Sequence, residues 1–253
     1  MIKKLSLFIL FALIFSGPTF SEIFKVSYIN PKTKLIKAYN KDDGKYLWQS
    51  ITKVQTVEVN GKMMLKITED CRGLWGNKNE RTWKAENYYI YLDDRAIPDR
   101  SSITFYDSKG NVVEKQGKKY SRDDKKVYCL RNEEKKEFDY EGDLIDKELL
   151  GTCLMNYPYG RKEDFEFHMM TNEPAHYKMT MVNKGTEILT VNGATIECYK
   201  LQMIPDLGFL GIFAPFVPKT YFWYKMTLPH EFVRYEGLES GLNTPYIVME
   251  ASD

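Results

Sequence analysis

The chain has 253 residues, in which 36 Lys and Arg stand against 35 Asp and Glu, with three histidines and four cysteines. This near-neutral balance leaves no electrostatic footprint for nucleic acid or for an anionic membrane surface. The length fits one large β domain or two small ones.

The first 21 residues have the pattern of a secretory signal peptide. Two lysines at positions 3 and 4 precede an apolar run at 5–15, and Thr19 and Ser21 supply the small side chains of a cleavage site before Glu22. Eleven apolar residues are too few to span a bilayer core of about 30 Å as a helix. We therefore expect a mature domain at 22–253 that is periplasmic or secreted. An uncleaved N-terminal anchor is the alternative.

Most of the remaining sequence alternates in the way that is typical of β-strands. Tight turns separate several of the alternating segments, and Asn60-Gly61 and Asn192-Gly193 have the preferred composition of a type I′ hairpin turn. The predicted strands are 24–29, 46–59, 62–68, 82–92, 102–106, 111–115, 126–130, 163–170, 176–182, 187–191, 195–203, 220–226, 231–237 and 245–249.

One segment has helical spacing instead. Residues 143–155 carry apolar side chains at 144, 145, 149, 150, 154 and 155, and Asp143 is placed to cap a helix. The sequence thus predicts a mainly β protein in which one internal helix separates two antiparallel meanders. A single continuous sheet is favoured over two domains.

Several strands in the second half are apolar on both faces, so both faces need a cover. Methionines and aromatics on an inner face suit an adaptable binding cavity, and they suit a solid core equally well. The residues that we expect to line such a cavity are Phe165, Phe167, Met169, Tyr177, Met179, Met181, Leu201, Tyr221 and Trp223.

The segment LGFLGIFAPFVP at 207–218 has no charge, and its glycines and prolines argue against a strand or a membrane-spanning helix. Exposing its three phenylalanines would forgo about 2 kcal/mol for each ring. They could pack into the core, close a cavity as a lid, or dip into a membrane or partner surface. In the lid hypothesis the covering residues are Phe209, Leu210, Phe213 and Phe216.

A resemblance adds to this interpretation. The segments GTEILTVNGATIECYKLQM (185–203), YFWY (221–224) and TLPHEFVRYEG (227–237) resemble a recurrent pattern in a family of exported bacterial proteins of unknown function (DUF3108-like). The resemblance covers roughly 143–250. It implies a half-barrel similar to that of the periplasmic lipoprotein carriers (LolA-like), in which a curved antiparallel sheet wraps an apolar cavity lined by a helix. It supplies no catalytic residues.

Catalytic and metal-binding patterns are not evident in the sequence. His168 and His176 fall on adjacent predicted strands, but no third ligand is specified and His230 lies elsewhere. We therefore expect no metal and no cofactor. Cys71, Cys129, Cys153 and Cys198 have no metal-binding spacing. They either form at least one disulfide, which export permits, or remain four buried thiols.

These patterns favour non-catalytic binding of a hydrophobic or amphiphilic ligand, such as a lipid or an acylated protein, with a membrane surface or envelope protein as a further partner. The main alternative is a structural or interaction protein of the cell envelope, with a solid core and an apolar loop that docks onto a partner. An enzyme ranks third.

Overall fold

The computed structural model describes residues 31–77, 80–92, 95–140, 144–160, 164–171, 175–206, 208, 217–241 and 244–252. The signal peptide predicted at 1–21 and the strand predicted at 24–29 lie outside these residues. Among the residues that are described, no helix is both long enough and apolar enough to cross a membrane.

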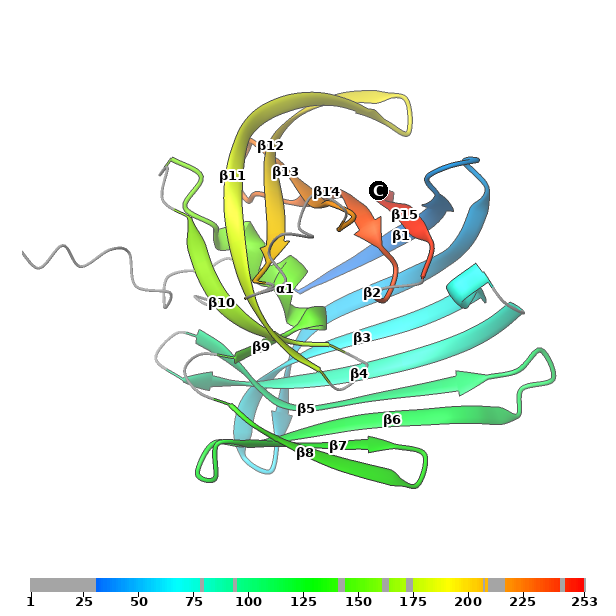
Figure 1. The fold of residues 1–253 in the computed structure, drawn as a ribbon, viewed down its shortest axis with the longest axis vertical. Helices are drawn as coiled ribbons and strands as arrows, with labels where there is room; N and C mark the ends of the chain where they lie inside the picture. The colour runs from blue at the N-terminus through cyan, green and yellow to red at the C-terminus, as the bar shows by residue number, and fades with distance from the viewer. Residues whose placement is uncertain are drawn as a thin grey trace, which may run out of the picture.

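Fifteen strands of the described chain form one sheet (Figure 1). Their order across the sheet is β8-β7-β6-β5-β4-β3-β2-β1-β15-β14-β13-β12-β11-β10-β9. The prediction of a single continuous, mainly antiparallel sheet is confirmed. The strands are β1 (Lys32–Asn40), β2 (Tyr46–Val59), β3 (Lys62–Leu74), β4 (Glu80–Leu92), β5 (Arg95–Tyr106), β6 (Val112–Ser121), β7 (Lys126–Arg131), β8 (Glu134–Asp139), β9 (Leu144–Asp146), β10 (Phe165–Met170), β11 (His176–Val191), β12 (Ala194–Pro205), β13 (Thr220–Lys225), β14 (Phe232–Leu238) and β15 (Tyr246–Ser252).

Two pairings organise this sheet. β1 pairs with β15, which joins the first meander to the second. β9 pairs with β10 in parallel, whereas the other neighbours run antiparallel. Parallel neighbours need a crossover connection, and here the connection carries helix α1 (Lys147–Cys153). The crossover therefore places the helix on one face of the sheet.

The two predicted hairpin turns are confirmed. Asn60 and Gly61 have φ angles of 51° and 75°, and Asn192 and Gly193 have φ angles of 50° and 79°. Both residues of a type I′ turn need positive φ, which Asn and Gly tolerate best.

The sheet is rolled but unclosed, and its two ends overlap (Figure 1). Tyr120 of β6 and Val127 of β7 form a buried cluster with Leu144 of β9 and Met170 of β10. The β9 end of the sheet thus packs against the β6–β7 end.

Helix α1 lies inside the curve of the sheet (Figure 1). Its buried residues Leu149, Leu150 and Cys153 pack into a main core to which strands from both halves of the chain contribute. The predicted internal helix is confirmed, but it is shorter than the predicted segment 143–155. Leu144 and Ile145 belong to β9 instead, and their side chains are buried on opposite faces of that strand. A short apolar pair fits a doubly covered strand as well as a helix.

The helix begins one turn later than predicted, and its cap differs accordingly. The side chain of Asp146 accepts the backbone N–H of Leu149 at 3.0 Å, and Asp143, the predicted cap, lies outside the described residues. Short 3₁₀ turns follow at Leu154–Asn156 and, between β3 and β4, at Trp75–Asn77.

Candidate ligand-binding site

Six of the nine residues predicted to line a cavity lie together in the main core. They share an exposed fraction of 6% or less. They come from β10, β11 and β12, and they are Phe165, Phe167, Met169, Met179, Met181 and Leu201. Their side chains occupy core positions, as in the solid-core alternative, and a cavity at these residues stays a prediction.

The structure does not bring the other three residues to this group. Tyr177 is 45% exposed. Trp223 and Tyr221 belong to a separate cluster with Cys198 and Val233, on the opposite face of β13. Phe222 and Tyr224 are the β13 residues that face the main core. The strand is apolar on both faces, so alternation alone does not show which face turns inward.

The predicted lid residues Phe209, Leu210, Phe213 and Phe216 lie outside the described residues. The lid hypothesis therefore stays a prediction.

A pocket of about 260 Å³ lies where the two ends of the sheet overlap. We call it the rim pocket. Its walls come from the end of β4, the start of β5, the β6–β7 turn, Tyr140 and β9. The lining residues are Leu92, Arg95, Ala96, Ile97, Pro98, Tyr120, Arg122, Lys125, Tyr140 and Leu144.

The rim pocket is amphiphilic. Leucine, isoleucine, alanine and proline side chains form an apolar wall, while Arg122 and Lys125 bring charge to an exposed turn. Tyr120 is 7% exposed, and its buried hydroxyl has no hydrogen-bond partner. Leaving a buried polar group unpaired costs about 1–3 kcal/mol.

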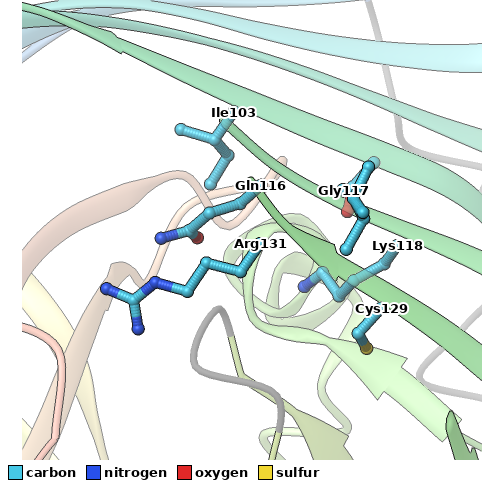
Figure 2. Close-up of a pocket in the computed structure, with 8 residues that line it drawn as sticks. Ile103, Gln116, Gly117, Lys118, Cys129 and Arg131 are labelled. Carbon is cyan, nitrogen blue, oxygen red and sulfur yellow. The ribbon is translucent and has the colours of Figure 1, made fainter. Parts of the chain in front are cut away.

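A second hollow lies between β5, β6 and β7 and has a volume of about 10 Å³. Figure 2 shows Ile103, Gln116, Lys118, Cys129 and Arg131 around it. That volume holds about one water molecule and is too small for an organic ligand.

A group of ionisable residues surrounds the start of α1. We call Glu69, Lys118, Asp146, Lys147 and Glu148 the helix-start cluster. Lys118 Nζ lies 3.5 Å from Glu148 Oε2, and both side chains are only 6% exposed.

The other polar contacts of this cluster fix the helix to the sheet. Tyr89 Oη donates to Asp146 Oδ1 at 2.9 Å, whereas the buried Asp146 Oδ2 has no hydrogen-bond partner. Lys147 Nζ donates to the backbone carbonyl of Glu239 at 2.8 Å.

The cluster carries three carboxyl groups against two ammonium groups, in surroundings that disfavour charge. Burial raises the pKa of Glu69 to about 7, and nearby Glu148 adds to the rise. Burial also raises the pKa of Asp146, again with a contribution from Glu148, and lowers the pKa of Lys147. The cluster is therefore suited to take up protons near neutral pH.

Tyr120 connects the rim pocket with this cluster. Burial raises the pKa of its hydroxyl, and the charges of Asp146 and Glu148 raise it further. No periodic or motif signal in the sequence indicates either feature, because both form only when β9 packs against the opposite end of the sheet.

The structure also places the three histidines. His168 and His176 lie side by side on β10 and β11, with ring centroids 4.9 Å apart. His230 packs instead against Tyr159, with ring centroids 4.7 Å apart. Among the described residues, no three His, Cys, Asp or Glu side chains gather in a way that could hold a metal ion.

The fold resembles that of a solved β-barrel-like protein. That protein carries a domain of unknown function, DUF1849, and comes from Brucella abortus. The TM-score is 0.54 at 6% sequence identity, over 88% of this chain and 96% of that one. The hypothetical lipoprotein YmcC from Escherichia coli gives a TM-score of 0.34 at 9% identity, over 93% of this chain and 95% of that one, which is too low to support an argument.

No protein-family model matches this sequence, and no curated protein matches it. The structural similarity supports a barrel-like β fold, as the sequence resemblance implied. Membership of the DUF3108-like family stays a prediction.

Proposed function

We propose that this protein binds a hydrophobic or amphiphilic small molecule, without catalysis, in the rim pocket. The observation that carries the proposal is the pocket itself, whose apolar wall adjoins the exposed turn that carries Arg122 and Lys125. Its volume of about 260 Å³ is near the lower end for small-molecule sites. A compact ligand, or one segment of a longer acyl chain, fits this size.

The amphiphilic lining indicates how such a ligand would lie. Its apolar part would cover Ile97, Pro98 and Leu144, and its polar part would meet the exposed turn that carries Arg122. The signal peptide predicted at 1–21 supports a location for this binding in the cell envelope. We infer that the ligand is a lipid or a lipid-like molecule, as the sequence resemblance also implies.

Filling the pocket tests this proposal. We expect Ile97→Trp to weaken uptake of a fluorescent fatty acid at least tenfold, because the larger indole would fill the space next to the apolar wall. Ile188→Trp is the matched control, since Ile188 is 66% exposed on β11 and does not line the pocket. Equal uptake by both variants and the unmodified protein would show that the fatty acid binds elsewhere or non-specifically.

The second candidate function is that of an interaction protein of the cell envelope. The tight burial of Phe165, Met181 and Leu201 favours it, because these residues already fill the interior where a cavity was predicted. Native mass spectrometry of protein purified from cells separates the two candidates. A co-purifying lipid supports ligand binding, whereas a ligand-free mass together with a concentration-dependent dimer supports the alternative.

A further inference from the structure

The histidine pair on β10 and β11 brings two imidazole rings together. His168 lies opposite Lys178, and His176 lies opposite Met170, in the antiparallel register of the two strands. Directly opposed residues and residues two apart on one strand share a face. His168, Met170 and His176 therefore lie on the same face, with the imidazole centroids 4.9 Å apart.

His176 has a nitrogen that lacks a partner. Its Nε2 atom is buried and makes no hydrogen bond. A buried polar atom of this kind calls for an unseen water molecule or ion. Burial lowers the pKa of His176, and the neighbouring His168 lowers it further. This direction favours the neutral form of the ring, which is the form that binds metals.

The surroundings of the pair indicate which metal it would take. Met170 is fully buried and offers a soft thioether on the same face as both imidazoles. Lys178 also lies on this face, but its ammonium is paired with Glu166 at 2.9 Å. Two imidazoles bind Cu²⁺ more tightly than other divalent ions of the first transition row, and a thioether favours Cu⁺.

We propose that His168 and His176 bind a copper ion, with Met170 as an additional ligand in the Cu⁺ state. Because the described chain has no third His, Cys, Asp or Glu at this place, the remaining ligands of Cu²⁺ would be water. This proposal is independent of the rim pocket.

Titration of the purified protein with Cu²⁺ tests the two imidazoles. We expect one bound equivalent whose electron paramagnetic resonance spectrum shows hyperfine coupling to two nitrogen atoms. His168→Gln and His176→Gln should each weaken binding at least tenfold and leave coupling to one nitrogen. His230→Gln is the matched control, because this third histidine packs against Tyr159 and should leave copper binding unchanged.

Two results would overturn the copper site. One is a spectrum of the unmodified protein without two coupled nitrogens, which needs no variant to fold. The other is a loss of affinity in His230→Gln as large as in His168→Gln. For Met170, competition with a Cu⁺ chelator should show at least tenfold weaker Cu⁺ binding in Met170→Leu, with Cu²⁺ binding unchanged. Equal Cu⁺ affinity would remove Met170 from the ligand set.

Discussion

At the scale of single residues, Glu69 carries a charge that its surroundings disfavour. It lies on β3 near Asp146 and Glu148, and its pKa rises to about 7 chiefly through burial. Between about pH 4.5 and pH 7 the folded state holds a proton that the unfolded chain has released. The free energy of unfolding contributed by Glu69 is therefore highest below this range and falls as the pH rises through 7.

Replacing Glu69 by Gln should remove this dependence. At pH 8 we expect Glu69→Gln to stabilise the protein by about 1–3 kcal/mol, the upper figure being the full cost of a pKa rise from 4.5 to about 7. At pH 5 the difference should shrink to less than about 1 kcal/mol, because the carboxyl group of the folded state is then protonated. Urea unfolding at the two pH values measures both effects.

The difference in the free energy of unfolding between the variant and the unmodified protein cancels the contributions of the other titrating groups. His176, whose pKa is lowered, acts in the opposite sense because acidification must charge a partly buried ring. Glu134→Gln on the exposed strand β8 is the matched control and should change stability by less than about 0.5 kcal/mol at either pH. Destabilisation of Glu69→Gln at pH 8 would contradict the argument.

At the scale of elements, the three-residue strand β9 stabilises the fold by packing on both of its faces. Leu144 faces the cluster formed with Tyr120 and Val127, whereas Ile145 faces the main core. We expect Leu144→Ala to cost about 2–4 kcal/mol in the free energy of unfolding, because it removes buried methyl groups and leaves a cavity. Chemical denaturation measures the loss.

Leu130→Ala on β7 is the matched comparison, since Leu130 is 41% exposed and should lose less than about 1 kcal/mol. Equal losses in the two variants would mean that the two ends of the sheet do not pack against each other. Leu144 also lines the rim pocket. A larger loss of stability in Leu144→Ala than in Leu130→Ala would therefore show that the pocket lies where the two ends of the sheet pack together.

The strands that were predicted from the sequence alternate clearly between apolar and polar residues, whereas the strands that were missed do not. The segment 46–59 matches β2 at both ends, because alternation is strong and an Asn-Gly turn ends it. β8 has the sequence EKKEFD and is almost wholly exposed, so it carries no core face to detect. Such charge suits the outer edge of a sheet, where it discourages pairing with other chains.

Other strands were missed or divided because their sequences show too little alternation between apolar and polar residues. β9 has only three residues, all of them buried. The predicted strands at 176–182 and 187–191 are one strand, β11, with an irregular register between Asn183 and Thr186. This irregularity interrupts the alternation and makes one strand look like two.

The candidate sites were less predictable than the fold. The side-by-side placement of His168 and His176 follows from adjacent strands and was visible in the sequence. The rim pocket and the helix-start cluster were not, because they depend on how close β6 lies to β9, where Tyr120 clusters with Leu144 and lies within the electrostatic influence of Asp146. Such contacts require knowledge of how the sheet rolls, which strand patterns alone do not specify.

At the scale of the whole molecule, the roll divides the buried interior into three clusters. The main core lies around α1, a second cluster lies between the overlapping ends, and a third lies on the far side of β12 and β13. A barrel-like protein with 6% sequence identity has a similar fold. A similar fold therefore forms with almost entirely different side chains.

The four cysteines are distributed over these clusters. Cys71 of β3 and Cys153 of α1 lie in the main core, Cys129 lies between the overlapping ends, and Cys198 lies on the far side of β12. All four are free and buried. The hypothesis of at least one disulfide is therefore wrong for this structure, and the alternative of four buried thiols holds.

This distribution predicts that the fold does not depend on redox conditions. A thiol-specific reagent should find almost no reactive cysteine in the folded protein and four after unfolding. Burial raises the pKa of Cys198 to about 11, so its reactive thiolate form is scarce at neutral pH. A reducing agent should leave the melting temperature unchanged. A lower melting temperature after reduction, with fewer than four thiols in the unreduced unfolded chain, would instead reveal a disulfide, and would require two of these separated segments to approach each other.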